Sequence, residues 1–367
     1  MHNPLQVLKH YWGYDGFRPG QAEVIDSILS GHDTLALMPT GGGKSITFQV
    51  PALANPGICL VVSPLVALMK DQVKNLQKRG ILSAFISSEM PHWEILQQLD
   101  NCILGDYKFL YISPERISSE LFQEKLKTLS RKVNLLVVDE AHCISQWGND
   151  FRRDYRLIAD IRDVIPHVQV IAVTASATAA VVADICEQLH FRKGYRIFKT
   201  SFERKNLSFV VRKTDNKLKE ICHILSAVPG SAVIYSRTRK GVEEYAGKLR
   251  AAGISAEYFH AGLDPVLKTE RQADWVKGFT RVLVATNAFG MGIDKGDVRV
   301  VIHTEFPDSM EAYYQEAGRA GRDGKRAYAV ALLGPQDITD IKRRPSNAFP
   351  TIEYIKRVYE ASVSYTH

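Results

Sequence analysis

The chain has 367 residues, which is enough for two or three domains with separate cores. Its 45% apolar and 24% charged residues are ordinary for a soluble globular protein, and no uncharged apolar run is long enough to cross a membrane. The net charge of +7 permits a polyanionic partner but does not indicate one by itself.

The five cysteines are scattered along the chain and include no Cys-x-x-Cys pair. The first residues lack the basic-then-apolar order of a signal peptide. We therefore expect reduced thiols in a cytoplasmic protein, with neither a disulfide framework nor a zinc site.

Short apolar strands alternate with amphipathic helices along the chain, which is typical of a parallel α/β fold. Helices are expected between the strands, for example at Leu65–Arg79 and Val242–Ala252. The predicted strands, in chain order, are Thr34–Met38, Cys59–Ser63, Phe109–Ser113, Leu135–Val138, Val168–Val173, Ala232–Tyr235, Val282–Ala285, Val300–His303 and Tyr328–Leu333.

A polar, basic segment at Thr200–Asn206 separates two strand–helix series, so we interpret it as a linker between domains. The tail is expected to be helical, with Pro345, Asn347 and Pro350 separating it from the sheet, and its uncapped end predicts the start of a truncated further domain. The expected parts are an N-terminal lobe, a C-terminal lobe and the tail, at residues 1–202, 203–335 and 336–367.

The first chemical motif is Pro39-Thr-Gly-Gly-Gly-Lys-Ser45, which follows the strand ending at Met38 and opens a helix. Its glycines let amide groups turn toward a phosphate at a helix N-terminus. Lys44 would reach the β- and γ-phosphates, and the Ser45 hydroxyl would hold Mg²⁺. Met38 stands where the strict pattern has another glycine, and a glycine-rich turn with a chance Lys-Ser is the alternative. The expected nucleotide-binding residues of this motif are Thr40, Gly41, Gly42, Gly43, Lys44 and Ser45.

The second motif, Asp139-Glu-Ala-His142, closes the apolar strand Leu135–Val138. Carboxyl ends of parallel strands form the edge where ligands of α/β proteins bind, so these acids are expected beside the phosphate loop. Asp139 suits the Mg²⁺ shell, and Glu140 suits the polarisation of the attacking water. A solvated acidic pair is the alternative, and His142 could equally be a hydrogen-bonded core histidine.

The two motifs and a later Gln315-Glu-Ala-Gly-Arg-Ala-Gly-Arg322 occur in the order seen in superfamily 2 helicases. The finer resemblance, over roughly residues 5 to 335, is to the RecQ family. It implies two RecA-like parallel-sheet lobes in tandem, with an ATP cleft between them.

Trp12-Gly-Tyr14 and Phe17-Arg-Pro-Gly-Gln21 resemble the family's adenine-recognition segment. The resemblance implies that Tyr14 stacks on the base, that Arg18 supports it, and that the Gln21 amide reads the adenine edge. An amphipathic N-terminal helix with a core aromatic residue is the alternative.

Residues 63–72 resemble a segment of the family that lies near the DNA backbone, so Lys70 could touch a phosphate, with a solvated helix face as the alternative. Residues 139–155 resemble an aromatic-rich loop that couples DNA binding to hydrolysis. Trp147 and Phe151 would stack on bases for about 1–3 kcal/mol each, and Arg152 would pair with phosphate. Trp147, Phe151 and Tyr155 also have helical spacing, so a buried stripe is the alternative, which Gly148 disfavours. The expected DNA-binding and coupling residues are Lys70, His142, Gln146, Trp147, Phe151, Arg152 and Thr286.

Three further stretches resemble family motifs of the second lobe: Tyr235-Ser-Arg-Thr238, Phe259-His-Ala-Gly-Leu263 and the segment from Ala285 to Lys295. The last implies that Thr286 and nearby amides hold a DNA phosphate, and that Asp294 lies near the ribose of the nucleotide. In the first lobe, Thr174-Ala-Ser-Ala177 stands where the family commonly has Thr-Ala-Thr-Ala.

Arg319 and Arg322 are expected at i and i+3 on one helical face, where they would neutralise charge on the γ-phosphate in the transition state. Arginines of this kind contribute about 10³–10⁵ in rate in related phosphoryl-transfer enzymes. A surface helix with two solvated arginines is the alternative, which the glycine before each arginine disfavours.

The favoured function is an ATP- and Mg²⁺-dependent, DNA-stimulated ATPase and 3′-to-5′ DNA helicase core, monomeric and acting in DNA repair and recombination on single-stranded or 3′-tailed DNA. If the source is bacterial, it would be associated with the nucleoid. An RNA-directed remodeller of the same superfamily and a non-motor nucleotide-binding switch or scaffold are the alternatives. The chain has no cysteine after Cys222, so the zinc module common in the family is not expected. The sequence therefore does not predict that this chain separates DNA strands by itself.

Overall fold

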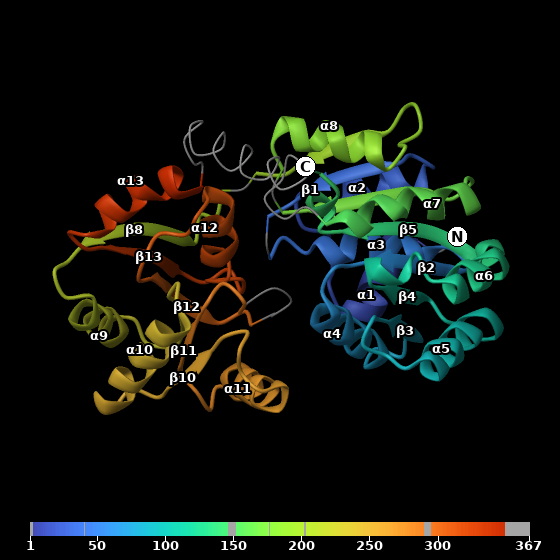
Figure 1. The fold of residues 1–367 in the computed structure, drawn as a ribbon. Coiled ribbons are helices and arrows are strands. Elements are labelled where there is room, and N and C mark those ends of the chain that lie inside the picture. Colours follow the sequence, from blue (N-terminus) through green and yellow to red (C-terminus); the bar gives the residue numbers. More distant parts are fainter. Residues whose placement is uncertain are drawn as a thin grey trace, which may run out of the picture. The chain divides into compact units, whose positions relative to one another are not determined.

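The computed structural model describes residues 3–39, 41–145, 152–175, 177–201, 203–289 and 295–348, without the side chains of residues 311 and 344–348. These ranges form two compact units that meet in sequence at Glu203 and Arg204, here called the first and the second lobe. Each lobe is built on one parallel β-sheet (Figure 1). The predicted fold class of two parallel-sheet α/β lobes is therefore confirmed. No helix in the described ranges is long and apolar enough to cross a membrane.

The sheet of the first lobe has seven strands in the order β3-β4-β2-β5-β6-β1-β7, and each neighbouring pair is parallel. Its strands are β1 (Thr34–Leu37), β2 (Ile58–Val62), β3 (Ser83–Ile86), β4 (Phe109–Ile112), β5 (Val133–Asp139), β6 (Val170–Thr174) and β7 (Arg196–Lys199). Its α-helices are α1 (Pro4–Trp12), α2 (Gln21–Leu29), α3 (Lys44–Ala54), α4 (Val66–Gln77), α5 (His92–Leu104), α6 (Glu120–Leu129), α7 (Ile158–Val164) and α8 (Ala179–Gln188). Short 3-10 helices are η1 (Pro114–Arg116), η2 (Ser130–Lys132), η3 (Ala141–Ile144) and η4 (Arg153–Leu157).

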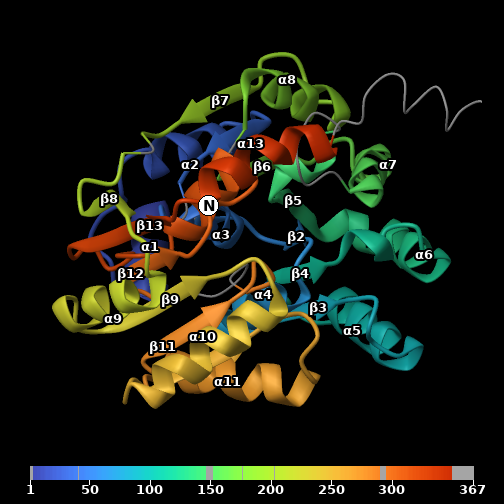
Figure 2. The same cartoon turned by 60° about the vertical axis from the view of Figure 1, so that its left-hand side comes forward.

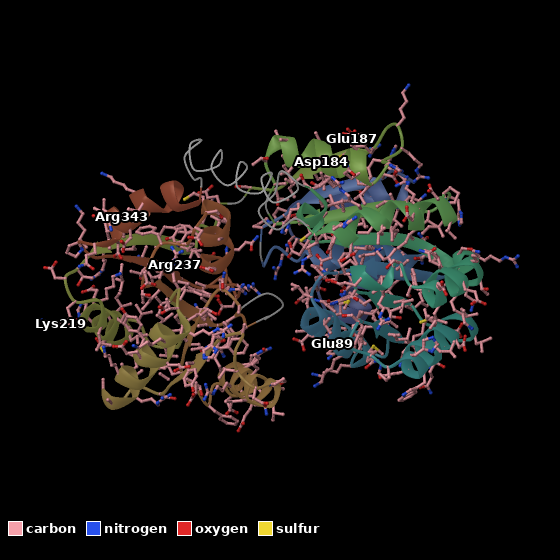
Figure 3. The ribbon with its side chains drawn as sticks, in the orientation of Figure 1. Glu89, Asp184, Glu187, Lys219, Arg237 and Arg343 are labelled. Carbon is pink, nitrogen blue, oxygen red and sulfur yellow. The ribbon has the colours of Figure 1, made fainter. Side chains whose placement is uncertain are left out.

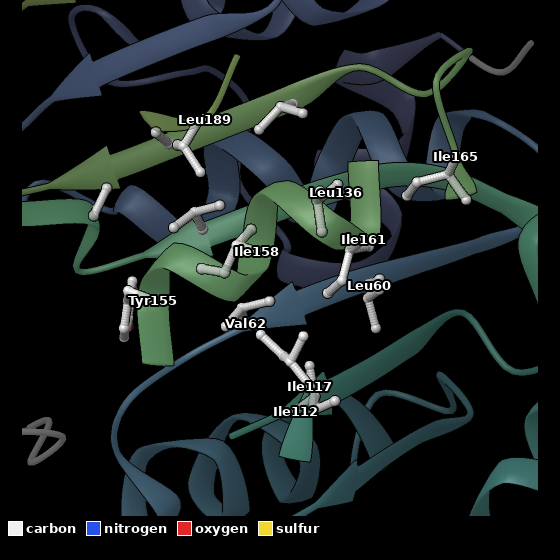
Figure 4. Packing of buried hydrophobic residues seen from close by; sticks show 14 of the residues in the cluster. Leu60, Val62, Ile112, Ile117, Leu136, Tyr155, Ile158, Ile161, Ile165 and Leu189 are labelled. Carbon is white, nitrogen blue, oxygen red and sulfur yellow. The ribbon is translucent and has the colours of Figure 1, made fainter. Parts of the chain in front are cut away.

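Helices cover both faces of this sheet, because successive side chains of a strand point to opposite faces. On β2, Leu60 and Val62 pack into the core on the side of α5 to α8, whereas Cys59 packs into the core on the side of α1 to α4. Figure 4 shows Leu60 and Val62 beside Ile161 and Ile158 of α7. Burial on both faces explains why the inner strands are almost wholly apolar.

The second lobe has a six-stranded sheet in the order β10-β11-β9-β12-β13-β8, and each neighbouring pair is again parallel. Helices α9 and α10 cover one face of it (Figure 2). Its strands are β8 (Leu207–Lys213), β9 (Ser231–Tyr235), β10 (Ala256–Phe259), β11 (Val282–Ala285), β12 (Val298–His303) and β13 (Ala327–Leu333). Its helices are α9 (Lys217–Ala227), α10 (Arg239–Ala251), α11 (Pro265–Lys277), α12 (Met310–Ala317) and α13 (Asp337–Ala348).

Every predicted strand is present, but four strands were not predicted, namely β3, β7, β8 and β10. These four are the outer strands of the two sheets. The expectation that Pro345 and Asn347 break the tail away from the sheet is wrong, because α13 begins at Asp337 and continues through both residues. Pro350 lies outside the described residues.

Candidate active site

The phosphate loop connects β1 to α3. Gly41 and Gly43 adopt the left-handed backbone conformation, with φ of 77° and 76°, which glycine tolerates far better than other residues. A Cβ on Gly42 would lie only 2.9 Å from the Pro39 carbonyl oxygen. No side chain caps the N-terminus of α3 at Gly43, so the end of the helix is suited to an anion. Thr40 lies outside the described residues.

The predicted adenine-recognition segment contacts this loop directly. Gln21 Nε2 donates to the Gly43 carbonyl oxygen at 3.0 Å, and Gln21 Oε1 accepts from the Arg18 amide at 2.8 Å. Arg18 Nη1 donates to the Gly41 carbonyl oxygen at 2.9 Å. Tyr14 is 51% exposed, as a residue that stacks on a base requires. Both ends of the Gln21 amide are therefore engaged with the protein backbone, which the sequence did not predict.

The lysine of the loop and the acids of the second motif lie together at the carboxyl edge of the first sheet. Lys44 Nζ is 3.7 Å from Glu140 Oε1. Asp139 accepts from the Ser63 hydroxyl at 3.4 Å and from the Glu140 amide at 3.0 Å. Desolvation and the neighbouring Glu140 carboxylate raise the pKa of Asp139 to about 6, although Lys44 opposes them.

These residues fit a nucleotide with Mg²⁺. Glu140 Oε2 is buried and has no hydrogen-bond partner within the described ranges, with His142 Nδ1 3.4 Å away. Burial and the adjacent Glu140 carboxylate, which raise the pKa of Asp139, would be offset by a bound cation. Mg²⁺ prefers oxygen ligands and usually takes only one or two carboxylates, with substrate phosphates and water completing its shell. Ser45, in the first turn of α3, and Asp139 are thus suitable protein ligands.

Two hydrogen bonds hold the acid motif to its surroundings. The Tyr155 hydroxyl donates to the Asp139 carbonyl oxygen at 2.8 Å, and its ring is fully buried in the core. For Tyr155 the buried alternative to the aromatic loop is therefore correct. His142 Nδ1 lies 2.9 Å from Thr174 Oγ1 at the end of β6. Ser63 directly follows β2, and Thr174 is the last residue of β6. A hydroxyl residue at the end of an apolar strand is the sequence signal that could have identified both.

Arg152 and Lys70 are two of the first-lobe residues expected to contact DNA, and the structure describes both. Arg152 Nη1 donates to the Pro64 carbonyl oxygen at 3.1 Å, so this guanidinium bonds the backbone that follows β2. Lys70 is exposed on α4, and its Nζ lies 3.7 Å from Oε2 of Glu89. Glu89 is labelled in Figure 3. Gln146, Trp147 and Phe151 lie outside the described residues.

In the second lobe, the predicted helical placement of Arg319 and Arg322 is wrong. Helix α12 ends at Ala317, and residues 318–323 form successive turns, because glycines at 318 and 321 favour the end of a helix. The Tyr235 hydroxyl is hydrogen-bonded with the Arg319 side chain. Thr286 follows β11 and is buried, and Asp294 lies outside the described residues.

Comparisons with known proteins agree with this arrangement. The family model for DEAD/DEAH box helicases matches residues 18–185, and the model for the helicase conserved C-terminal domain matches residues 216–324. The ATP-dependent DNA helicase RecQ of Bacillus subtilis is 43% identical over 341 residues, which are 92% of this chain and 57% of that protein. The probable ATP-dependent DNA helicase RecS of the same organism is 40% identical over 90% of this chain and 67% of its own length.

The chain belongs to the RecQ family of superfamily 2 helicases. It spans a little over half the length of the RecQ protein of Bacillus subtilis. The solved structure of the helicase MrfA bound to DNA matches with a TM-score of 0.77 over 95% of this chain and 50% of that one, at 17% identity. At 17% identity this match supports a shared fold and nothing further.

Proposed function

We propose that this chain is the motor core of a DNA helicase, which couples ATP hydrolysis to 3′-to-5′ movement along single-stranded DNA. The observation that carries the proposal is the meeting of the phosphate loop with the acid motif, where Lys44 Nζ and Glu140 Oε1 are 3.7 Å apart. Membership of the RecQ family supports DNA as the polymer. We extend the proposal to a monomeric motor that acts in DNA repair and recombination.

In this proposal the first lobe binds the nucleotide. The loop amides and Lys44 hold the β- and γ-phosphates, and Ser45 and Asp139 hold Mg²⁺. When bound, Mg²⁺ neutralises charge on the phosphate oxygens. Glu140 orients and polarises the attacking water.

The base is proposed to bind beside the phosphate loop. Tyr14 would stack on adenine, while Arg18 holds the loop through the Gly41 carbonyl oxygen. Gln21 would read the adenine edge by exchanging its bond to the Gly43 carbonyl oxygen for bonds to the base. Asp294 would lie near the ribose.

Arg319 and Arg322 are proposed to neutralise negative charge on the γ-phosphate in the transition state. His142 would link the acid motif to the end of β6 through Thr174, from which it is 2.9 Å away. The residues proposed to contact DNA or to couple it to hydrolysis are Lys70, Gln146, Trp147, Phe151, Arg152 and Thr286.

The test is ATP hydrolysis measured with Mg²⁺, first without nucleic acid, then with single-stranded DNA or with RNA of the same sequence. We expect strong stimulation by DNA and little by RNA. Equal stimulation by RNA would favour an RNA remodeller, and nucleotide binding without stimulated hydrolysis would favour a switch or scaffold. Unwinding of a 3′-tailed but not a 5′-tailed duplex then tests the direction.

A further inference from the structure

The turn that carries the two arginines, residues 318–322, is here called the arginine turn. The side chain of Arg204 bonds three of its carbonyl oxygens. Arg204 Nη2 donates to those of Ala320 at 2.9 Å and Gly321 at 2.6 Å, and Nη1 donates to that of Gly318 at 3.4 Å. Arg204 is also the first residue of the second lobe, so the chain enters this lobe at the arginine turn.

Asn206 adds a second set of contacts to the same turn. Its Nδ2 donates to the Gly321 carbonyl oxygen at 2.8 Å and to that of Lys325 at 2.8 Å, while its Oδ1 accepts from Arg204 Nε at 3.3 Å. Gly321 has a left-handed φ of 64°, and a Cβ there would lie 2.6 Å from Asn206 Nδ2. The close approach of the two segments therefore requires glycine at this position.

These contacts have a physical reason. Helix α12 ends at Ala317, so the carbonyl groups of Gly318, Ala320 and Gly321 lie beyond the helix and outside its hydrogen-bonding pattern. A cation is favoured there by the helix dipole. A guanidinium offers several N–H donors in a rigid planar fork, so one side chain can hold several carbonyl groups at fixed positions. Lysine would offer a single ammonium point charge instead.

We propose that Arg204 is a positioning residue: with Asn206 it fixes the backbone of the arginine turn, and so the placement of Arg319 and Arg322 for hydrolysis. The inference rests on the proposed function for its catalytic consequence. The fixing of the turn itself depends only on contacts within the second lobe.

The test compares Arg204→Met with Arg281→Met in the full chain. Arg281 is a matched control, because its guanidinium also donates to backbone carbonyl oxygens of the second lobe, those of Val228 at 3.1 Å and Gly230 at 3.1 Å, but at the end of α9. In Arg204→Met, amide hydrogen exchange at residues 318–322 should rise by at least about tenfold, reporting local opening. In Arg281→Met, exchange at the arginine turn should stay at the wild-type rate.

Misplacing a catalytic group by about an ångström costs roughly 10²-fold in rate, so the kcat of DNA-stimulated hydrolysis should fall about 10- to 100-fold in Arg204→Met. The KM for ATP should stay within about twofold, because the phosphate loop is untouched. Arg204→Lys should recover only part of kcat.

Unchanged exchange at the arginine turn in Arg204→Met would overturn the inference. So would an equal loss of kcat in Arg204→Met and Arg281→Met, since that would mark a general loss of stability. If the wild-type protein shows no nucleic-acid-dependent hydrolysis, the proposed function fails, and the exchange measurement still decides whether Arg204 fixes the turn.

Discussion

Lys44 Nζ lies 3.7 Å from Glu140 Oε1, so the ammonium group of the phosphate loop faces the carboxylate assigned to water activation. The two side chains are only 15% and 22% exposed. Glu140 has a left-handed φ of 48°, which is uncommon for a residue with a side chain. Strained backbone of this kind concentrates at functional sites, which supports the role proposed for Glu140.

Glu140→Gln should abolish most hydrolysis while nucleotide binding persists. The amide has nearly the shape of the carboxylate but cannot accept a proton from water, and general-base catalysis is worth about 10²–10⁴-fold in rate. Hydrolysis with saturating single-stranded DNA and binding of a fluorescent ATP analogue are the two measurements. Lys44→Ala should instead weaken nucleotide binding as well, because it removes the charge that faces the phosphates.

Glu244→Gln is the matched control for this pair. Glu244 also pairs with a lysine, with Lys248 Nζ 2.6 Å from its Oε1, but on the exposed surface of α10. This variant should hydrolyse ATP at the wild-type rate. Wild-type turnover in Glu140→Gln would contradict the role of Glu140 in activating the attacking water.

Asp139→Asn should stabilise the ligand-free protein near pH 7.5. Burial and Glu140 raise the pKa of Asp139 to about 6, above the unfolded value of about 3.9. The folded state therefore holds its proton more tightly, and stability is lost as the pH rises from about 4 through about 6. The variant should gain on the order of 1 kcal/mol at pH 7.5 and much less at pH 4.5, measured by urea unfolding. An equal gain at both pH values would contradict the raised pKa.

The inner strands of both sheets were predictable, because strands buried on both faces are continuous apolar runs. The outer strands were not. Strand β7 is mostly exposed, with Arg196 at its start and Lys199 at its end. Strand β8 alternates exposed residues such as Phe209 and Val211 with polar or half-buried ones. A strand that pairs on one side only needs less apolar sequence, so composition distinguishes it poorly from a loop.

Site residues were predictable where their motif comes soon after a buried strand, as for Lys44 after β1 and Glu140 after β5. Contacts between distant segments were not predictable in this way. Arg204 has the appearance of any linker arginine, and nothing in its neighbours shows that it bonds the Gly321 carbonyl oxygen. The same holds for Gln21, whose amide contacts the phosphate loop across a separation of 22 residues.

Affinity for single-stranded DNA should fall steeply as the salt concentration rises. The chain carries a net charge of +7, and neutralised phosphates release condensed counterions. The logarithm of the binding constant should decrease with the logarithm of salt with a slope of about −0.7 for each phosphate contacted. Fluorescence anisotropy of a labelled oligonucleotide between low and physiological salt measures the slope. A flat response would contradict the proposed contacts with DNA phosphates.

Asp33→Asn should destabilise the first lobe strongly. Asp33 is buried at the start of β1, where it accepts from the Arg192 amide at 2.7 Å, from the Val170 amide at 3.0 Å, and from Arg162. Burial alone would raise the pKa of Asp33, but these bonds outweigh it and the pKa is lowered. Removing one partner from a buried ion pair costs about 3–5 kcal/mol, because the buried Arg162 side chain keeps an uncompensated charge.

The sign of the pH dependence follows from that lowered pKa. The stability that Asp33 contributes is present above its unfolded pKa of about 3.9 and is lost as the pH falls through the folded value. The difference in unfolding free energy between wild type and Asp33→Asn should thus be full at pH 7 and shrink in acid. Asp100→Asn is the control, since Asp100 pairs with Lys125 at 2.7 Å on a partly exposed surface, and should cost at most about 1 kcal/mol. Equal costs for the two variants in urea unfolding at pH 7 would show that the Asp33 cluster is no more stabilising than a surface ion pair.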